Sequence, residues 1–375
     1  GLPRGKRWLY DSGTHIPLIV YVPEKWRAHA GLEAGRPDAR LVSCVDLAPS
    51  MLNLAGISIP GYMQGRPFVG PHQPGSRDYV FANRDRMDER YDMIRMVRDT
   101  RYKYLRNYRL DVPYNQFLEY AEQSPVKQDL NHHAADDTLP PGAHWITAAE
   151  KPVEELYDLE NDPHEIHNLS NDPAMDGVLR RMRAAHENWK ADIRDLGLIP
   201  EAELSRLQHV YGTRYRIYEG MAQDHPGFWK ELRETADAAG WLRAEDEKKL
   251  LAALKSAHPS VRYWAVIGLR RQPGNEALLR TALQDTSPMV AALAAQNLLE
   301  GDDADAAMKV LKTVLLGEDE WAALLAADAL DTAGEQARPA LPELQKVLES
   351  QENKYIVRVV EHALNKLQET ENEVN

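Results

Sequence analysis

The sequence contains a single cysteine, Cys44, among its 375 residues. One cysteine excludes a disulfide within the chain and any metal cluster held by several cysteine thiolates. No apolar run approaches the ~20 residues that a helix needs to span a bilayer. The sequence also has no initiator methionine, signal peptide or lipidation motif. What remains is the composition of a globular protein, with 43% hydrophobic and 27% charged residues.

Positive charge is scarce relative to negative charge. The chain has 45 lysine and arginine residues against 58 aspartate and glutamate residues, which gives a formal net charge of −13. Proteins that bind nucleic-acid phosphates need clustered lysine and arginine side chains, so this balance argues against a nucleic-acid partner. The lack of a long apolar run likewise argues against a membrane partner.

The longest apolar run lies near the start of the chain. Residues 16–22 are rich in branched side chains and contain or adjoin Pro17 and Pro23, which predicts a buried parallel strand. Such a strand needs hydrogen-bonded neighbours and cover on both faces. Few residues precede it here, so we expect its sheet to be built mostly by residues before Gly1. The chain is therefore predicted to be part of a longer protein.

Residues 43–56 have the pattern of a helix. Ser43 is a candidate N-cap with Asp46 three residues later, and Gly56 stands at the position where a helix commonly ends. Pro49 falls inside the segment and is expected to kink the helix or delay its start.

Residues 77–197 alternate strand-like segments with loops. Asp172 and Pro173 predict the start of a closing helix, by capping and by a first-turn proline. Residues 108–150 hold proline, asparagine, histidine and aspartate without periodicity, which predicts a long loop region. Four segments rich in aromatic and branched residues predict antiparallel strands, at residues 78–81, 93–98, 102–105 and 155–159.

From about residue 245 the sequence is repetitive. Four sets of apolar residues recur at steps of 29, 32 and 34 residues, and two of the units open with a proline, Pro259 and Pro288. A helical unit of this size cannot bury its apolar face alone, so the units are predicted to stack, and they resemble short HEAT repeats. The recurring residues are Val261, Ala265 and Leu269, then Val290, Ala294 and Leu298, then Ala322, Ala326 and Leu330, and then Ile356, Val360 and Leu364.

Several motifs in residues 1–197 resemble one enzyme family in both content and order. Together they are similar to the C-terminal portion of formylglycine-dependent (type I) sulfatases, which belong to the alkaline phosphatase-like superfamily. Residues 96–189 are most similar to the heparan N-sulfatase (sulfamidase) branch. The motifs are Gly5-Lys6, Tyr10-Asp11-Ser12-Gly13, Pro17-Leu18-Ile19-Val20, and the segments at residues 41–50, 54–57, 97–104, 155–165 and 168–169.

The resemblance implies a fold class and a domain organisation. Residues 1–76 are expected to form the end of an α/β catalytic domain, and residues 77–197 a small α+β subdomain with an antiparallel sheet. Residues 198–244 are expected to be a helical linker, and residues 245–370 an all-α HEAT-like solenoid.

The resemblance also implies a mechanism whose central groups lie outside this chain. Sulfatases of this type oxidise the Cys or Ser of a Cys/Ser-x-Pro-x-Arg motif to formylglycine, which attacks sulfur beside a divalent cation, usually calcium. No such motif occurs here, since Cys44 is followed by Val45 and Asp46, and residues 58–60 by Gly61. The family's metal ligands would also precede Gly1. We therefore expect formylglycine and calcium outside this chain, no metal ligands within it, and no turnover by the chain alone.

Lys6 is the residue to which the resemblance assigns catalysis and substrate binding. It matches the family's sulfate-binding lysine, whose ammonium holds a sulfate oxygen and offsets charge on the departing ester oxygen. Charge alone favours a solvated lysine of the basic segment 4–7, and the motif reverses this preference. His15 occupies a position where the family more often has arginine. It could contact substrate, or it could be a surface histidine at the start of a strand.

Residues 84–92 alternate three arginines with carboxylates. Arg84 and Arg86 are candidate substrate-binding residues, because arginine offers paired donors to sulfate or uronate groups. The alternative is a loop whose charges pair with one another. His132 and His133 are adjacent but have no further ligands nearby in the sequence, which favours a surface loop over a metal site.

Two functions from different classes follow from these observations. The first is a sulfatase (sulfuric ester hydrolase) acting on sulfate esters, or N-sulfate, of carbohydrates, in the periplasm or outside the cell. The second is a non-catalytic scaffold in which the HEAT-like repeats bind a protein or self-associate. Residues 300–335 hold ten carboxylates against Lys309 and Lys312, and such a surface would repel sulfated polymers. The repeats are therefore assigned to protein contact.

Overall fold

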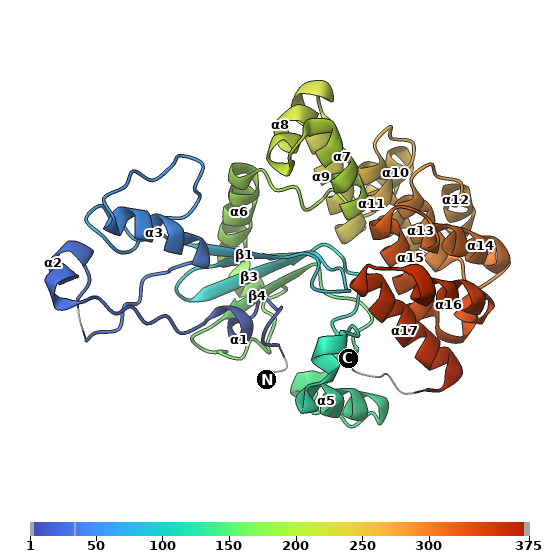
Figure 1. The fold of residues 1–375 in the computed structure, drawn as a ribbon, viewed down its shortest axis with the longest axis horizontal. Helices are drawn as coiled ribbons and strands as arrows, with labels where there is room; N and C mark the ends of the chain where they lie inside the picture. Colours follow the sequence, from blue (N-terminus) through green and yellow to red (C-terminus); the bar gives the residue numbers. More distant parts are fainter. Residues whose placement is uncertain (1–3, 34, 371–375) are drawn as a thin grey trace. The chain divides into compact units, whose positions relative to one another are not determined.

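The computed structural model describes residues 4–33 and 35–370, and the chain divides into two compact units. The sheet unit comprises Gly1–Arg84, Ile94–Arg106 and Glu154–Asp195. The helical unit comprises Asp85–Met93, Asn107–Val153 and Leu196–Asn375. Each unit is thus built from stretches that are far apart in the sequence, which Figure 1 shows by colour.

The sheet unit contains a four-stranded sheet with the order β1-β2-β3-β4. β1 pairs antiparallel with β2, and β3 pairs antiparallel with β4. The predicted antiparallel sheet is confirmed, with strand bounds that shift by up to a few residues. The strands are β1 (Val80–Arg84), β2 (Ile94–Arg98), β3 (Tyr102–Asn107) and β4 (Glu154–Asp158).

Successive side chains of a strand point to opposite sides of the sheet, and here both sides carry apolar residues. On one face Val97, Tyr104 and Leu156 pack against Leu179 and Met182 of α6 (Asp176–Ile193). The opposite face packs against the N-terminal turn, so α6 and the short helix α1 (Asp11–Thr14) lie on opposite sides of the sheet (Figure 1). The residues of that second face are Leu9, Tyr10, Ile94, Met96, Leu105 and Tyr157.

Two predicted helices of the sheet unit are present. Ser43 and Asp46 form the predicted capping box, and Gly56 has the left-handed φ of 69° that suits a residue after a helix end. The side chain of Asp172 accepts a hydrogen bond from the backbone N of Ala174, but α6 ends at Ile193, before the predicted Gly197. The short elements are η1 (Glu24–Trp26), α2 (Arg27–Ala30), η2 (Cys44–Asp46), α3 (Leu47–Leu54) and η4 (Pro173–Met175).

The predicted strand at residues 16–22 is wrong for this structure. The segment is not a strand, and residues 16–21 are exposed, with Ile19 at 93% and Tyr21 at 80%. A strand exists through its ladder hydrogen bonds, and no described strand of the chain lies beside this segment to provide them. The parallel α/β sheet that the resemblance implies is accordingly not seen in the described residues, where the sheet is antiparallel.

The predicted long loop at residues 108–150 is partly helical. It contains α4 (Glu119–Glu122), α5 (Pro125–Ala135) and η3 (Pro141–Thr147). Pro125 takes the first position of α5, where its missing N–H costs no hydrogen bond. The polar composition of α5 hides its helical period, because no residue of this helix is buried.

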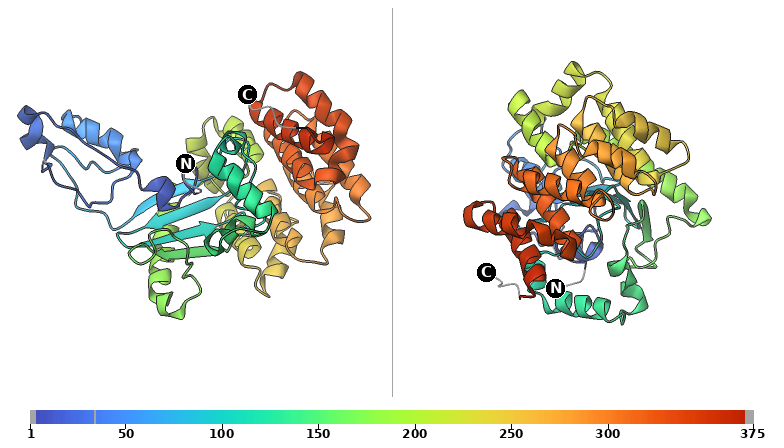
Figure 2. Two further views of the ribbon diagram at one scale, coloured as in Figure 1. Left: turned by 90° about the horizontal axis from the view of Figure 1, so that it is seen from below. Right: turned by 90° about the vertical axis from the view of Figure 1, so that its right-hand side faces the viewer.

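The remainder of the helical unit is a stack of helices. α9 packs on α11, α11 on α13, α13 on α15 and α15 on α17, while α10, α12, α14 and α16 pack beside this row (Figure 2). The helices are α7 (Glu201–Tyr211), α8 (Arg214–Asp224), α9 (Phe228–Trp241), α10 (Asp246–Ala253), α11 (Pro259–Arg270), α12 (Glu276–Ala282), α13 (Pro288–Asn297), α14 (Ala304–Leu315), α15 (Glu320–Ala333), α16 (Leu341–Ser350) and α17 (Lys354–Gln368), with η5 (Gly334–Ala340) between α15 and α16.

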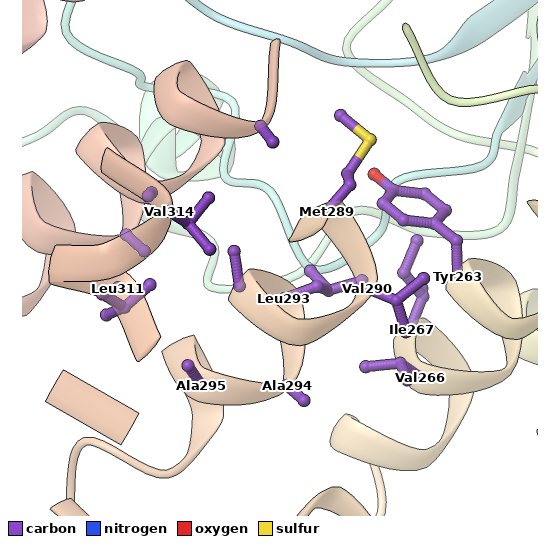
Figure 3. Packing of buried hydrophobic residues seen from close by; sticks show 14 of the residues in the cluster. Tyr263, Val266, Ile267, Met289, Val290, Leu293, Ala294, Ala295, Leu311 and Val314 are labelled. Carbon is purple, nitrogen blue, oxygen red and sulfur yellow. The ribbon is translucent and has the colours of Figure 1, made fainter. Parts of the chain in front are cut away.

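The recurring apolar positions form the core of this stack. All twelve residues that repeat in the sequence are buried, and none is more than 5% exposed. Figure 3 shows Val290, Leu293 and Ala294 of α13 packed between Val266 and Ile267 of α11 and Leu311 of α14. Pro259 and Pro288 begin α11 and α13, as their position before each apolar set predicts. None of the helices in the described ranges is long and apolar enough to cross a membrane.

Trp264 should be the most sensitive single core position of the helical unit. Its side chain is fully buried, and its indole N–H donates a 2.7 Å hydrogen bond to the carbonyl of Leu198, which ties the start of the helical segment to α11. Trp264→Ala is expected to lower the free energy of unfolding by about 3–5 kcal/mol, measured by urea denaturation. Trp26→Ala, at a tryptophan that is 52% exposed, is the control and should cost less than about 0.5 kcal/mol. Equal losses in the two variants would contradict the assignment.

Candidate functional site

Lys6 lies on a compact turn at the start of the sheet unit, and its side chain is exposed. The carbonyl of Gly5 accepts a hydrogen bond from the backbone N of Trp8, and the chain then enters α1. A Cβ at Gly13 would lie 2.4 Å from the Gly5 carbonyl oxygen, so the return of the chain past this turn requires glycine. The turn thus presents Lys6 outward from a closely packed backbone.

A buried lysine beneath the turn holds it to the sheet. The Lys103 side chain is fully buried, and its Nζ lies 2.6 Å from Asp11 Oδ1 and 2.8 Å from Glu165 Oε1. The same Nζ donates to the carbonyl of Leu9 at 3.1 Å. Glu165 Oε2 also accepts from the backbone N of Asp11 at 2.6 Å. β3, the N-terminal turn and the loop after β4 therefore meet at one ammonium group.

The two carboxylates of this cluster have opposite pKa shifts. Burial alone would raise the pKa of Asp11, but the charges and hydrogen bonds of Lys103 and Arg98 outweigh burial and lower it. For Glu165 burial prevails over the attraction of Lys103 and raises the pKa. Glu165 also has a left-handed φ of 56°, which is uncommon for a residue with a side chain. The cluster therefore fixes an unusual backbone conformation as well as the turn.

A second buried hydrogen-bond group lies on the same face of the sheet. Glu155 Oε2 accepts hydrogen bonds from the hydroxyls of Tyr10 at 2.8 Å and Tyr157 at 2.7 Å. Burial and the nearby carboxylate raise the pKa of Tyr157, so its hydroxyl keeps its proton. Arg4 lies over the Tyr10 ring, 3.9 Å from its centroid, and donates to the carbonyl of Glu165 at 2.9 Å. Both ends of the Lys6 turn are therefore anchored.

Two of the other predicted substrate-binding residues lie close to this turn. Arg84, at the end of β1, is 3% exposed and stacks on Trp8, with its guanidinium carbon 4.1 Å from the ring centroid. His15 follows α1, its side chain is 71% exposed, and its Nδ1 lies 3.5 Å from Asp11 Oδ2. The structure thus gathers Lys6, His15 and Arg84 around one turn of the sheet unit.

Arg86 belongs to the helical unit and is engaged there. Its Nε lies 2.8 and 2.9 Å from the two carboxylate oxygens of Glu201, and its Nη1 donates to the carbonyl of Glu89 at 3.0 Å. A substrate anion would have to displace Glu201 to reach this guanidinium. The role of Arg86 in binding substrate stays a prediction.

The third arginine of the run, Arg90, holds a buried ionic cluster. It donates to Asp328 at 2.6 Å, to Asp331, and to the carbonyl of Phe117 at 2.8 Å. Asp331 also lies 2.7 Å from His362 Nδ1. The Phe117 ring stacks on His362 with centroids 3.6 Å apart. Arg90 thus joins the segment after Asn107 to α15 and α17 within the helical unit.

The histidine pair does not form a metal site. His132 and His133 lie on α5, where each faces a carboxylate one turn away, at 3.2 Å from Asp136 and 3.8 Å from Asp129. Within residues 4–33 and 35–370, no three His, Cys, Asp or Glu side chains converge in a way that could hold a metal ion. The described residues therefore do not fit the calcium that the resemblance implies.

Sequence reasoning missed the groups that position the Lys6 turn. Lys103, Asp11 and Glu165 all fall within the motifs that carry the resemblance, but their pairing depends on the fold. One pattern could have indicated Lys103. It stands between two tyrosines in a strand whose neighbours are apolar, where a lysine is buried and needs a carboxylate partner.

The first part of the chain is similar in sequence to a known family. Residues 4–118 match the model of the family described as N-sulphoglucosamine sulphohydrolase, C-terminal. This match contains the Lys6 turn and strands β1 to β3. The first part of the chain is therefore similar in sequence to the C-terminal domain of this sulfatase family.

Known relatives agree with this match. The chain is 40% identical over 204 residues to an ulvan-active sulfatase of Formosa agariphila, a region covering 54% of this chain and 33% of that one. It is 26% identical over 215 residues to human N-sulphoglucosamine sulphohydrolase, covering 52% of this chain and 40% of the relative. The chain spans about a third of the length of the first of these relatives. Its homologues are thus sulfatases, including a sulfamidase.

A solved structure of a 2-O GAG sulfatase is also similar to this chain. The identity is 24% and the TM-score 0.29, with 43% of this chain and 27% of that chain covered.

Replacing Lys103 should destabilise the sheet unit. Lys103→Met leaves Glu165 buried without its cation and Asp11 with Arg98 alone, and breaking a buried pair in this way costs about 3–5 kcal/mol. We expect a matching fall in the free energy of unfolding and faster tryptic cleavage within residues 4–15. Lys248→Met, at an exposed position on α10, is the control and should change stability by less than about 0.5 kcal/mol. A loss below about 1 kcal/mol in Lys103→Met, with unchanged proteolysis, would show that the cluster does not hold the turn.

Asp331 should give the helical unit an acid-sensitive contribution to stability. Burial opposes its ionisation, but the hydrogen bond of His362 and the charge of Arg90 outweigh burial and lower the pKa of Asp331 to about 2 from 3.8. A carboxylate whose pKa is lower in the folded protein stabilises the fold at pH values above its unfolded-state pKa, here 3.8. This stabilisation is lost as the pH falls through the folded-state pKa of about 2. The shift corresponds to about 2 kcal/mol.

The measurement is the unfolding free energy of wild type and Asp331→Asn between pH 5 and pH 2. Wild type should lose about 2 kcal/mol more than the variant across this range. Asp305→Asn, at an exposed residue of α14, is the control and should follow wild type. Parallel curves for wild type and Asp331→Asn would contradict the assignment.

Proposed function

We propose that this chain is the C-terminal part of a sulfatase that hydrolyses sulfate esters, or N-sulfate, of carbohydrates. The observation that carries the proposal is the family match of residues 4–118, which includes Lys6 and most of the elements that anchor its turn. The homologues over the first half of the chain, all sulfatases, support the same reaction class. The activity of the whole protein would need residues outside this chain.

In this proposal Lys6 acts directly on the sulfate group. Its ammonium is a compact charge that can hold a sulfate oxygen and offset negative charge on the ester oxygen as the bond to sulfur breaks. Such stabilisation requires a donor that is already in place before the reaction. The buried contacts of Lys103, Arg4 and Tyr10 support this role, because they fix the turn that carries Lys6. His15 would contact the substrate beside Lys6.

The nucleophile and metal of this reaction would come from outside the chain. A formylglycine hydrate would supply the nucleophile, and calcium would polarise the sulfate. The sequence lacks the Cys/Ser-x-Pro-x-Arg motif, and no converging set of metal ligands lies within residues 4–33 and 35–370. The contribution that we assign to this chain is binding and orientation of the sulfate group.

The named activities of relatives suggest the substrate class. One relative is an ulvan-active sulfatase and another is a sulphoglucosamine sulphohydrolase, and both names refer to sulfated carbohydrates. We extend this class to the present protein, together with a periplasmic or extracellular location where such polymers occur.

A scaffold function of the helical stack is the second candidate. The stacked helices α9 to α17 resemble HEAT repeats, and their carboxylate-rich segment from residue 300 to 335 would repel sulfated polymers. In this role the stack would bind a protein partner or a second copy of the chain. The two functions are compatible, and only the first requires Lys6.

Lys6→Ala tests the catalytic proposal in the full-length enzyme that contains this chain. We expect kcat/KM on an aryl sulfate to fall by ~10²–10³-fold, the loss expected for removing one preorganised stabiliser of transition-state charge. Lys6→Arg should restore little activity, because a planar guanidinium does not replace a compact ammonium in a fitted pocket. Thermal stability should hardly change, since Lys6 is exposed.

The matched control is Lys25→Ala, at an exposed lysine of η1 in the same unit. It should keep wild-type kinetics. If Lys6→Ala retains kcat/KM within about threefold of wild type, Lys6 is a solvated surface lysine and the assignment falls.

A further inference from the structure

The helical unit contains a cleft that the sulfatase reaction does not use. Its volume is about 670 Å³, within the range of small-molecule sites. One wall is formed by the segment from Arg109 to Asn131, and the other by residues of α13, α15 and α17, among them Gln296, Leu325 and His362. The second wall lies outside residues 4–118, so the family match does not account for this cleft.

The charges that line the cleft are already paired with one another. Arg90 binds Asp328 and Asp331, and Arg109 binds Asp111 at 2.8 Å. The two lysines are paired as well, Lys127 with Glu122 at 3.6 Å and Lys366 with Asp331 at 3.6 Å. Four basic and four acidic side chains therefore cancel. An anionic ligand would have to break buried ion pairs to bind here, so the chemistry favours a neutral occupant.

Neutral polar groups of the cleft have unused hydrogen-bonding capacity. Gln296 accepts from Arg270 through Oε1, while Gln128 and Gln116 each donate through Nε2 to a backbone carbonyl. Across the described part of the chain, no group bonds to the other half of these three amides. One donor and two acceptors are thus available. Hydroxyl groups, which both donate and accept, match such a set.

The cleft also offers apolar surface between these polar groups. The ring of Phe117 is held by its stack on His362, and Leu325, Val112 and Pro113 contribute aliphatic atoms. A site with apolar surface and a few convergent polar groups fits a ligand that has both carbon-hydrogen faces and hydroxyl edges. A pyranose ring has this composition.

We infer that this cleft binds uncharged sugar residues of a carbohydrate chain. The inference rests on the proposed sulfatase function, which gives the cleft its use. An enzyme that acts on a polymer gains affinity from substrate units remote from the reacting sulfate. The paired charges of the walls set the selectivity, since they admit hydroxyl groups and disfavour sulfate. The cleft is thus a second site, which binds hydroxyl groups, whereas the exposed ammonium of Lys6 is proposed to bind sulfate.

The test is calorimetric titration of the full 375-residue chain with a sulfated hexasaccharide and with the same hexasaccharide after chemical desulfation. The desulfated form should bind at least about tenfold more tightly. Thr332→Trp should abolish this binding. Thr332 is an exposed residue of α15 that lines the cleft, and its hydroxyl bonds only to its own helix at the Asp328 carbonyl, so a large side chain fills the cleft without disturbing the core.

Thr313→Trp is the matched control. Thr313 is an exposed residue of α14 near the end of its helix, and its hydroxyl bonds in the same way to the Lys309 carbonyl, outside this cleft. It should bind the sugar like wild type, and both variants should unfold at the wild-type temperature. Gln296→Ala, which removes one of the available amides, should weaken binding by about tenfold.

Three outcomes would overturn the inference. They are no heat of binding with either hexasaccharide, tighter binding of the sulfated form that persists in the Lys6→Ala variant, and equal loss of binding in the two tryptophan variants. None of these measurements depends on turnover, so sugar binding and the catalytic role of Lys6 succeed or fail independently.

Discussion

The ammonium of Lys103 is buried between Asp11 and Glu165, which come from opposite ends of the sheet unit in the sequence. A charge in this position is tolerated only if its partners are held in place, because removing one partner leaves an uncompensated ion in a medium of low polarity. The N-terminal turn and the loop after β4 are thereby obliged to meet at β3. In the helical unit Arg90 imposes the same condition on the segment after Asn107, α15 and α17.

This constraint connects packing with function. The Lys6 turn packs Trp8, Leu9 and Tyr10 against one face of the sheet. The ion pairs and hydrogen bonds beneath it fix the path of its backbone. An exposed lysine on a mobile loop loses side-chain and backbone entropy when it grips an anion. On an anchored turn only the side chain must be ordered. The buried cluster therefore fixes the backbone of this turn, which is the preorganisation that the proposed sulfate contact would need.

The sequence predicted those features that repeat or that depend on neighbouring residues. The helical stack follows from apolar positions such as Val261 and Val290, and the helix at residue 43 from its capping box. Features that depend on distant partners were not predictable. Residues 16–22 look like a strand because of their side chains, but a strand also requires a paired neighbour. The partner of Arg86 is Glu201, and nothing in the local pattern of residues 84–92 distinguishes it from the acidic residues beside Arg86.

The fate of the arginine run explains why an anion site should be sought at a lysine. Arg84 stacks on Trp8, Arg86 is held by Glu201, and Arg90 by two aspartates, so each guanidinium serves internal structure. A planar guanidinium suits such buried, directed contacts. To recruit one for substrate, the protein would have to leave a carboxylate or an aromatic ring without its partner. Lys6 is exposed on a fixed backbone, and its compact ammonium is the kind of cation that the proposed contact with a sulfate group requires.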